Sequence, residues 1–452
     1  MMPSKIRKLM GSSAFARNAP YDFQNSMPPS ILPVAPLNAR FRLLLSCIAL
    51  FAVSNRASAD VAGVQSILAP ETATAASNEA ARAVASLDAW VDRIETSGKV
   101  AGLAIAVVEK DQVLLERGIG LADSSSGEVV SANTVLRLAS HSKAFATTLS
   151  AMLVRDGRLH WDTPVASLLP TFKLADDASS GKLTIADILS HRVGLPHNTY
   201  DRLLEQDEPY PLLAARLGEI PLTCPVGECY AYQNVAFSLI GDVTFAVTGN
   251  FFSHEVEKRV FHPLGMISAT YGRDGLEQSA HWAKPHRRVR GHWTAFEPKE
   301  TYYRMPPAAG ANASLRDMEQ WLIAQMGGRP EILPEQLLQT LHSPLVETPG
   351  DLSSTPWRRE RLVDAQYALG WRIFQYGDEQ LVFHAGAVQG YRAMIGFLPK
   401  QRFGLVMLWN CESAAPAGLL PMLMDRYLDL PAVDWAGLDK ASRTRQQAGD
   451  AG

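Results

Sequence analysis

Hydrophobic and polar residues change their spacing along the chain, and these changes predict the order of its elements. Residues 75–96 carry apolar side chains at helical spacing, which indicates an amphipathic helix. Two runs of β-branched and aliphatic residues follow, at 103–109 and 112–118. The turn-like Lys110-Asp111 between them predicts a β-hairpin.

The rest of the chain keeps this contrast between helical spacing and strand-like runs. Helical patterns dominate from residue 140 to about residue 320, and strand-like patterns return after it. The expected helices are 145–154, 185–189, 235–247 and 414–428, and the expected strands are 367–374, 379–384, 391–398 and 403–408. Strands at both ends with helices between them predict one α/β domain that carries an inserted helical region.

The N-terminal region has the pattern of a secretory signal. Arg40 and Arg42 precede an eleven-residue apolar run at 43–53, and Ala-Ser-Ala at 57–59 supplies a small-x-small cleavage site. This run is shorter than the roughly 20 apolar residues that a membrane-spanning helix needs. The alternative is a buried N-terminal helix, but little else in the leader has a foldable pattern. We expect cleavage after Ala59 and a periplasmic or secreted mature chain without a membrane helix.

The charge of the chain is the sum of two unequal parts. The 452 residues include 43 basic and 46 acidic ones, for a formal net charge of −3. Residues 1–59 hold seven basic residues and one acid, which leaves 36 basic and 45 acidic residues, or −9, in residues 60–452. With 47% hydrophobic and 20% charged residues, the chain has globular rather than disordered or fibrous composition. The net charge of −3 gives no reason to expect a nucleic-acid partner. We also expect a monomer.

These patterns divide the chain into a leader, a body and a tail. We expect the body, residues 60–438, to form one composite domain between the leader at 1–59 and a polar, loose tail at 439–452. The α/β part of the body comprises about 75–137 and 312–430, and its mostly helical part comprises about 138–311.

Three cysteines lie in the body. Cys224 and Cys229 are close enough in sequence to close a small disulfide loop, which would leave Cys411 free. A bridge is compatible with export but is not required by it. A zinc site is not expected, because this pair lacks the second pair or the histidines that zinc needs.

The first chemical signal is Ser140-His-Ser-Lys143. Residues 135–139 run into Ser140, and helical periodicity follows, so Ser140 is expected at the start of a helix. Free backbone N–H groups there favour developing negative charge. Lys143 lies one helical turn further on, where a desolvated lysine can act as a base toward the serine hydroxyl. A capped helix with a solvated lysine remains the alternative for this motif alone.

Two later motifs strengthen the hypothesis of an active site. Tyr232-Gln-Asn234 precedes an apolar helical run; its phenol can relay a proton, and its amide can hold Lys143 and a substrate carbonyl. His384-Ala-Gly386 ends a predicted strand, and a backbone N–H at the following Ala387 could complete an oxyanion hole with that of Ser140.

Ser-x-x-Lys, Tyr-x-Asn and His-x-Gly in this order resemble the class C β-lactamase and D,D-peptidase superfamily of serine hydrolases. The likeness covers about residues 85–429, and as a combination it is highly specific. Flanking stretches also resemble the family: Arg-Leu-Ala-Ser at 137–140, Asp-Thr-Pro-Val at 162–165, Leu-Ser-His-Arg-Val-Gly-Leu at 189–195, Tyr-Ala-Leu-Gly-Trp at 367–371 and Gly-Tyr at 390–391.

The resemblance implies a fold and a nucleophile. It implies an antiparallel sheet flanked by helices, with an inserted, mostly helical subdomain. Ser140 would attack a carbonyl and form an acyl-enzyme, and Lys143 and Tyr232 would share proton transfer. Which of these two is the base stays open. Asn234 would orient Lys143 and the substrate amide.

The resemblance also implies the substrate-binding groups. The N–H groups of Ser140 and Ala387 would bind the oxyanion, and His384 and Gly386 of the third motif would line the pocket opposite Tyr232. No metal and no organic cofactor is implied. The expected partner is a small-molecule or peptidoglycan-type substrate, with pocket walls around residues 200–210 and 302–309.

The third motif departs from that of dedicated class C β-lactamases, which have Lys-Thr-Gly where this chain has His384-Ala-Gly386. A lysine there attracts a substrate carboxylate, whereas histidine is half charged only near pH 6.5. Arg392 is a candidate replacement for the charge, or a surface strand residue. We therefore expect hydrolysis of an amide, ester or β-lactam, with possible β-lactamase activity. The alternatives are a D,D-carboxypeptidase or D-aminopeptidase, a carboxylesterase, and a penicillin-binding protein without turnover.

Other candidate residues have simpler interpretations. His191 and His197 flank a Gly-Leu-Pro turn and are expected to pack locally rather than bind metal. Ser314 begins a helix capping box, so it is not a second nucleophile. The arginines at 287–290 are expected in a solvated loop, with an anionic-substrate rim as the alternative. Gly118-Ile-Gly120 lacks the third glycine of a dinucleotide loop.

Overall fold

The computed structural model describes residues 76–439, so the predicted signal region and most of the predicted tail lie outside the described residues. A nine-stranded sheet organises the described part, with every neighbouring pair antiparallel. In spatial order its strands are β3 (Glu128–Val129), β2 (Gln112–Asp123), β1 (Gly102–Glu109), β14 (Phe403–Trp409), β13 (Tyr391–Leu398), β12 (Glu379–Val388), β11 (Arg372–Tyr376), β10 (Leu362–Tyr367) and β9 (Val346–Glu347). The predicted hairpin is confirmed as β1–β2, and the predicted fold class is confirmed.

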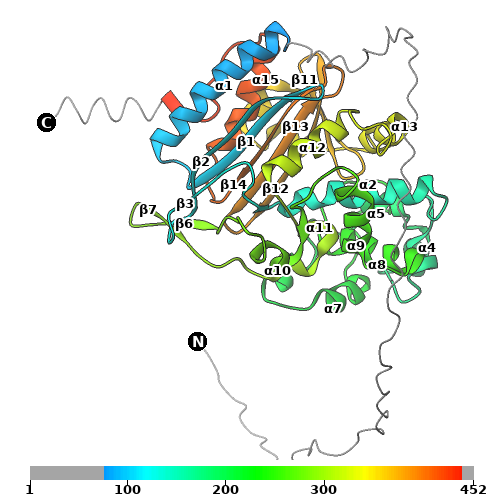
Figure 1. Cartoon of the computed structure of the whole chain (residues 1–452). Helices are drawn as coiled ribbons and strands as arrows, with labels where there is room; N and C mark the ends of the chain where they lie inside the picture. Colours follow the sequence, from blue (N-terminus) through cyan, green and yellow to red (C-terminus); the bar gives the residue numbers. More distant parts are fainter. Residues whose placement is uncertain (1–75, 440–452) are drawn as a thin grey trace, which may run out of the picture. The chain divides into compact units, whose positions relative to one another are not determined.

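Helices cover both faces of this sheet (Figure 1). On one face α1 (Asn78–Ser97) packs with α15 (Leu419–Tyr427), and on the other α12 (Leu315–Gln325) packs on β1 and β14. All residues of β1 are therefore buried. Alternate side chains face the two layers: Leu103 joins the cluster with Leu87 of α1, and Ala104 joins the cluster with Trp321 of α12.

The first helix shows how local signals set its limits. The Ser77 side chain caps α1 by accepting from the Ala80 N–H at 3.2 Å, and Gly98 ends the helix in a left-handed conformation, with φ of +65°. Leu87, Val91 and Ile94 are buried against the sheet. The amphipathic pattern thus located this helix correctly.

The middle of the chain forms the mostly helical part, drawn at the lower right of Figure 1. A small antiparallel sheet of β4 (Leu136–Arg137), β8 (Ala311–Ala313) and β5 (Thr270–Tyr271) stands at its boundary. A separate hairpin, β6 (His286–Val289) and β7 (His292–Ala295), projects beside β3. The helices are α2 (Ser142–Arg155), α3 (Val165–Leu168), α4 (Asp177–Lys182), α5 (Ile185–Leu189), α6 (Asp201–Glu205), α7 (Tyr210–Ala215), α8 (Val235–Thr248), α9 (Phe252–Val256), α10 (Gly272–Glu277) and α11 (Pro306–Ala309).

The C-terminal part corrects one predicted element. The expected strand at 367–374 is instead the end of β10 and the start of β11, because the chain turns between them and Gly370 adopts φ of +73°. A Cβ at Gly370 would lie 2.7 Å from Oγ1 of Thr147, so this turn packs tightly on α2. Two more helices complete the fold, α13 (Glu335–His342) and α14 (Pro356–Arg361).

Two further expectations concern cysteines and membrane helices. Cys224 and Cys229 form a disulfide, and Cys411 is a buried free thiol. Among residues 76–439, no single helix is long and apolar enough to cross a membrane. Residues 235–248 and 252–261 pass that test only as a pair bent by 78°, as core helices of proteins without membrane spans also do.

Candidate active site

Ser140 lies at the entrance of a helix, next to strained backbone. A 3₁₀ turn over Ala139–His141 leads directly into α2, so the helix itself begins at Ser142 rather than at Ser140 as expected. Ala139 adopts φ of +50°, a left-handed conformation that costs energy for a residue with a Cβ. Ser140 is partly exposed although the residues on both sides of it are buried. The turn therefore presents one hydroxyl at the end of a helix.

The turn that carries Ser140 is held from two sides. Ser142 donates from Oγ to the Ala139 carbonyl at 2.7 Å and accepts from the Ala311 N–H of β8 at 2.9 Å. On the other side β12 packs so closely that a Cβ at Gly386 would lie 2.0 Å from the Leu138 carbonyl oxygen. The third motif therefore needs glycine at this position, and β12 directly contacts the Ser140 turn.

Lys143 is wholly buried one turn below Ser140. Its Nζ donates to Oδ1 of Asn234 at 2.7 Å and to the carbonyl of Ala308 at 3.0 Å. Burial lowers the pKa of Lys143 to about 7, Asp201 opposes this change, and Arg372 adds to it. The interpretation of Lys143 as a solvated helix residue is thus wrong.

Tyr232 lies against both Ser140 and Lys143. A side-chain hydrogen bond joins it to Ser140, and Nζ of Lys143 is 4.6 Å from the centre of its ring. Burial raises the pKa of Tyr232 to about 12, although the hydrogen bond with Ser140 and the charge of Arg372 act in the opposite direction. At neutral pH Tyr232 is therefore a phenol and not a phenolate.

The segment before α8 that carries Tyr232 and Asn234 is tied to the turn at His191–Asn198. The Gln233 N–H donates to Nδ1 of His191 at 3.1 Å, and the Asn198 N–H donates to the Tyr232 carbonyl at 2.8 Å. The His191 ring also packs 4.3 Å from that of Tyr232. The prediction that His191 packs locally is confirmed.

Asp201 completes the buried polar group, and the sequence analysis missed it. Nδ2 of Asn234 donates to Oδ2 of Asp201 at 2.7 Å, while Oδ1 of Asn234 accepts from Lys143. Burial raises the pKa of Asp201, and the hydrogen bond from Asn234 opposes this change. Asp201 is the first residue of the short helix α6, and its surroundings in sequence carry no motif.

His384 lies on the predicted strand, but its ring is buried and neutral rather than partly charged. It is 2% exposed, and its ring packs edge-on against His141 at 5.8 Å and Trp371 at 6.3 Å. Within residues 76–439 neither ring nitrogen has a hydrogen-bond partner. Burial lowers the pKa of His384 well below its usual value. This residue is therefore a neutral ring against the Ser140 turn at neutral pH.

Ala387 and Arg392 border an open pocket of about 500 Å³. They are paired across β12 and β13, and Ala387 is exposed. Glu205 and Tyr302 also line this pocket, and the Tyr302 hydroxyl donates to Oε1 of Glu205 at 2.8 Å. The walls expected around residues 200–210 and 302–309 therefore do meet at a pocket.

Arg372 is a second charged residue that the sequence analysis missed. It follows Trp371 at the start of β11 and forms an ion pair with Asp351. Together with Tyr230 it borders a second pocket, of about 760 Å³. Its positive charge lowers the pKa values of both Lys143 and Tyr232.

The remaining candidates take structural roles. Ser314 forms the predicted capping box with Asp317 of α12. Gly120 lies within β2, where a Cβ would come 2.2 Å from the Ala101 carbonyl, so it allows close strand packing. In the part of the chain that the structure describes, no group of three or more His, Cys, Asp or Glu side chains is placed to hold a metal ion.

Three comparisons relate the chain to known proteins. The family model "Beta-lactamase" matches residues 87–427. The chain is 28% identical over 364 residues to "Unguisins hydrolase ungD" of Aspergillus violaceofuscus, covering 74% of this chain and 63% of that protein. It is 26% identical over 329 residues to "Protein flp" of Staphylococcus aureus strain MW2, covering 72% of this chain and 63% of that protein. The chain thus spans less than two thirds of the length of these curated relatives.

Solved structures show the same fold. A penicillin-binding protein homologue from Pyrococcus abyssi, described as octameric, superposes with a TM-score of 0.68 at 20% identity, covering 77% of this chain and 78% of that one. The crystal structure of SurE superposes with a TM-score of 0.61 at 22% identity, covering 78% of each chain. At these identities the likeness concerns the fold alone.

Proposed function

Because this chain belongs to the β-lactamase family, we propose that it is a serine hydrolase that works through an acyl-enzyme on Ser140. The observation that carries the proposal is the state of Lys143. A fully buried lysine whose pKa is about 7 is close to half neutral at neutral pH, so it is available as a base. It lies beside a tyrosine that is hydrogen-bonded to the partly exposed serine.

The contacts of Lys143 leave its lone pair free in the neutral form. A neutral amine has two N–H bonds and one lone pair, and two carbonyl acceptors, Oδ1 of Asn234 and O of Ala308, take the two N–H bonds. The lone pair then occupies the remaining direction. In the proposed mechanism it draws the proton from Oγ of Ser140, either directly or through the Tyr232 hydroxyl.

Tyr232 then acts as the proton carrier. Its pKa of about 12 supports a role as a phenol that donates a proton to the leaving group while the C–X bond of the substrate breaks. The protonated Lys143 then returns a proton to Tyr232, so both are neutral in the acyl-enzyme. When water attacks the acyl carbonyl, it passes a proton to the Tyr232 oxygen while the tyrosine passes its own proton to Lys143. As the bond between the acyl carbon and Oγ of Ser140 breaks, the proton goes back from Lys143 through Tyr232 to Oγ.

Negative charge on the carbonyl oxygen requires donors. We assign the role of hydrogen-bond donors to this oxygen to the N–H groups of Ser140 and Ala387, because the close packing of Gly386 on Leu138 fixes β12 against the nucleophile turn. Asn234 holds Lys143 and contacts the substrate amide. The third motif acts mainly through this packing, since His384 is buried and neutral.

The substrate is an ester, an amide or a β-lactam. A neutral His384 supplies no fixed charge for the carboxylate of a β-lactam, which supports weak β-lactamase activity relative to ester or D-amino-acid peptide hydrolysis. The other candidates are a D,D-carboxypeptidase or D-aminopeptidase, a carboxylesterase, and a penicillin-binding protein that acylates without turnover. We further propose a monomeric protein, exported to the periplasm or secreted; the Cys224–Cys229 disulfide supports an oxidising compartment.

A hydrolysis panel tests this function. Purified protein is assayed with a chromogenic cephalosporin, p-nitrophenyl butyrate and a D-Ala-D-Ala peptide, and its nucleophile is labelled with an active-site phosphonate. Ser140→Ala should abolish every hydrolysis and all labelling. Ser314→Ala is the matched control, because Ser314 also begins a helix but only caps it, and this variant should be labelled normally.

Undiminished labelling of Ser140→Ala would show that the nucleophile lies elsewhere. Labelling of the unchanged protein without turnover on any substrate would favour the penicillin-binding alternative.

A further inference from the structure

Two pockets lie beside the proposed oxyanion site and the β6–β7 hairpin. The pocket beside Ala387, of about 500 Å³, and a second pocket beneath the hairpin, of about 570 Å³, share Gln389 and Glu412 in their walls. The two pockets are therefore neighbours, and we call them together the basic groove.

The basic groove gathers positive charge on an acidic protein. Two carboxylates line it, those of Glu205 and Glu412. Residues 60–452 of the sequence, in contrast, carry a net charge of −9. Its six basic side chains are Arg137, Lys299 and Arg392 in the near pocket and Lys99, Arg287 and Arg288 in the far pocket.

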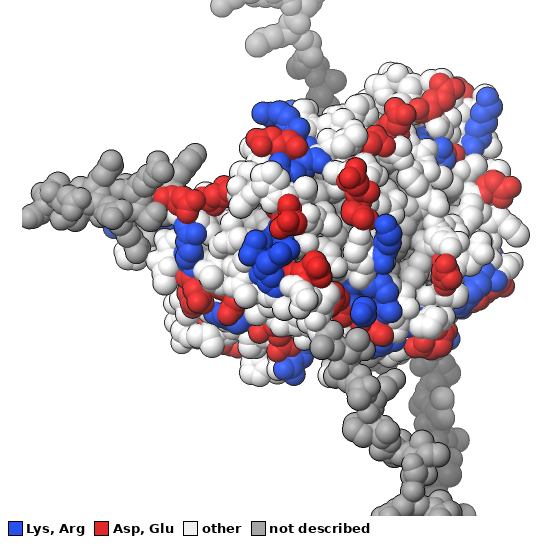
Figure 2. Space-filling model, turned by 90° about the horizontal axis from the view of Figure 1, so that it is seen from above, with Lys and Arg blue, Asp and Glu red and all other residues white. Residues whose placement is uncertain are grey.

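These cations lack the carboxylate partners that other basic residues have. Among the ion pairs of residues 76–439, none includes any of the six, whereas Arg117, Arg259 and Arg361 each pair with an acid. Figure 2 shows acidic and basic side chains interspersed over the face seen from above. The groove thus holds two carboxylates and six basic side chains without an ion pair inside the described part of the chain.

Carbonyl groups and aromatic rings hold the near-pocket guanidinium groups in place. Arg392 donates from Nη1 to the carbonyls of Val388 at 2.6 Å and Tyr391 at 2.8 Å. Arg137 is 3% exposed, lies 3.5 Å from the centre of the Tyr303 ring, and has no partner for Nε and Nη2 within the described residues. Neutral groups therefore hold these guanidinium groups, and Glu412 in the same pocket acts on Arg392 through its charge without forming an ion pair with it.

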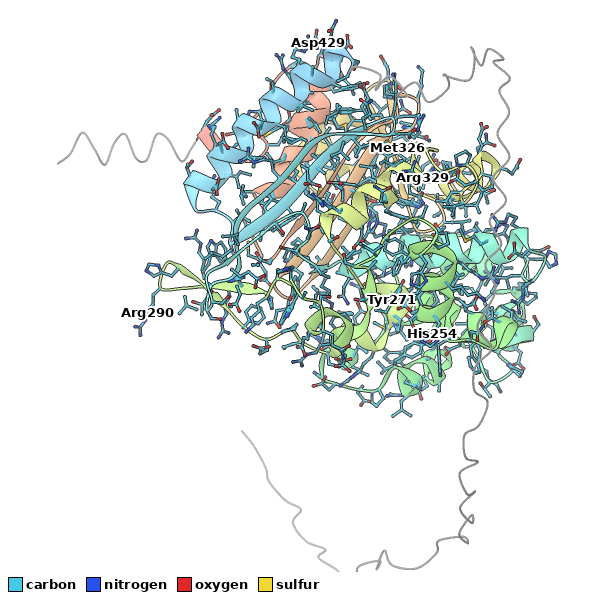
Figure 3. The ribbon with its side chains drawn as sticks, in the orientation of Figure 1. His254, Tyr271, Arg290, Met326, Arg329 and Asp429 are labelled. Atoms are coloured by element: carbon cyan, nitrogen blue, oxygen red, sulfur yellow. A yellow bond between two sulfur atoms is a disulfide. The ribbon has the colours of Figure 1, made fainter. Side chains whose placement is uncertain are left out.

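The far pocket repeats this arrangement on the hairpin. Arg288 lies 4.6 Å from the centre of the Trp293 ring and also donates to the carbonyl of Gly98. Arg287 lies 5.7 Å from the centre of the Phe296 ring. Arg290, labelled in Figure 3, lies at the tip of the same hairpin, away from the sheet.

We propose that the basic groove binds free carboxylates on the acyl side of the substrate. The inference rests on the proposed function, in which Tyr232 protonates the leaving group. Ala387, one of the two assigned oxyanion donors, borders the 500 Å³ pocket, and Tyr230 and Arg372 border the 760 Å³ pocket. In this proposal the acyl chain lies on the side of Ala387 and the leaving group on the side of Arg372. A carboxylate a few bonds from the reacting carbonyl meets Arg392, and one further along meets Arg287 and Arg288.

Isosteric esters test the near pocket. Mono-p-nitrophenyl adipate differs from p-nitrophenyl hexanoate only by a carboxylate in place of the terminal methyl group. We expect kcat/KM to favour the adipate by about tenfold at low salt, and the preference to fall as the salt concentration rises. Arg392→Gln should remove most of the preference, measured as the ratio of the two kcat/KM values so that a loss common to both esters cancels, and Arg392→Lys should restore part of it.

A longer pair tests the far pocket. For mono-p-nitrophenyl sebacate against p-nitrophenyl decanoate, the double variant Arg287→Gln/Arg288→Gln should lose about fivefold or more of the preference and leave the adipate preference unchanged. Arg316→Gln is the matched control, because Arg316 is paired with Glu116 on a different part of the protein. It should change neither ratio.

The outcomes separate this inference from the proposed function. Hydrolysis of hexanoate with no preference for adipate, or a preference that survives Arg392→Gln, overturns the basic groove alone. Absence of hydrolysis of every ester together with absence of Ser140 labelling overturns the proposed function and this inference with it.

Discussion

Asn234 and Asp201 are joined by a 2.7 Å hydrogen bond in which the asparagine amide donates and the carboxylate accepts. This bond fixes the direction of the amide, because its other end, Oδ1, must then face Lys143. A rotated amide would direct N–H groups at the lysine ammonium and lose both contacts. Asp201 is therefore a positioning residue for the proposed base, and its negative charge also favours the protonated form of Lys143.

Asp201→Asn should move the pH profile of Ser140 acylation to lower pH. Asparagine keeps an acceptor for Asn234 but removes the charge that raises the pKa of Lys143. Because Lys143 acts in its neutral form, a lower pKa moves the acidic limb of kcat/KM downward, by on the order of one pH unit. The measurement is the rate of phosphonate labelling between pH 5 and pH 9, buffered at constant ionic strength.

Asp242→Asn is the control for this shift. Asp242 is also a carboxylate whose pKa is raised by burial, and it accepts from the Tyr210 hydroxyl at 2.7 Å. It has no contact with Lys143, so its substitution should leave the acidic limb in place. An unchanged or upward-shifted limb in Asp201→Asn would contradict the electrostatic role of Asp201.

Lys143→Ala should slow acylation by about 10²- to 10⁴-fold, the usual effect of losing an acid–base group. The loss should persist at every pH, because no other described group bonded to Asn234 Oδ1 can replace the amine. Burst kinetics with p-nitrophenyl butyrate separate acylation from deacylation. A small effect would mean that Lys143 only fills space beneath Ser140.

Lys143 should also make stability depend on pH. Its pKa is about 7 in the folded state and about 10.4 when unfolded, so between these values the unfolded chain binds the extra proton. The shifted pKa of Lys143 therefore raises the free energy of unfolding as pH rises from 7 to 10, by about 1.4 kcal/mol per pH unit at most. Below pH 7 its contribution is constant. Lys143→Met removes this pH dependence. The free energy of unfolding of the variant minus that of the unchanged protein should therefore be highest at pH 7 and decline toward pH 10.

Urea unfolding at pH 7, 8 and 9 measures that difference. Lys182→Met is the control, because Lys182 is exposed at the end of α4 and should give a difference that does not vary with pH. A constant difference for Lys143→Met as well would contradict the depressed pKa.

Gly386→Ala should damage both folding and catalysis. The added Cβ would lie 2.0 Å from the Leu138 carbonyl oxygen and 3.1 Å from the His141 nitrogen, so β12 must move away from the Ser140 turn. We expect a loss of about 1–3 kcal/mol in stability and at least a 100-fold loss in kcat/KM. In Gly181→Ala, the control, nothing lies within 4 Å of the new Cβ, and activity should be unchanged. Normal activity of Gly386→Ala would remove the close contact from the mechanism.

Local patterns were enough to predict much of the fold. The strand Tyr391–Leu398 and the helix Ile185–Leu189 have the predicted limits, because each is a continuous buried element with polar or turn residues at its ends. The β10–β11 turn was missed, since the apolar residues around it face the core in both strands. The β6–β7 hairpin was missed because it is polar and mostly exposed, so hydrophobic periodicity carries no signal there.

Some residues of the site could also be predicted from the sequence and others could not. The motifs place Ser140, Lys143 and Tyr232 together, and the structure does bring these residues into contact. Asp201 and Arg372 were not predicted, because each reaches the site only through the tertiary fold and neither belongs to a motif. The state of His384 also depended on packing: its sequence neighbours do not reveal that His141 and Trp371 enclose its ring.

The Cys224–Cys229 disulfide should stabilise the segment that leads to Tyr232. It closes a loop with a sequence separation of 5, and the loop-entropy relation gives about 2 kcal/mol for so short a loop. Thr223, the residue before this loop, donates from its N–H to the Gly194 carbonyl at 2.7 Å, and Gln233 donates to the nearby Pro196 carbonyl. Loosening of the loop therefore reaches the turn that holds Gln233. Cys224→Ser/Cys229→Ser should therefore unfold at lower urea and lose activity several-fold through kcat rather than KM. Treating the unchanged protein with a reductant should reproduce both effects, whereas a reductant effect of equal size on the double variant would place its origin at another thiol.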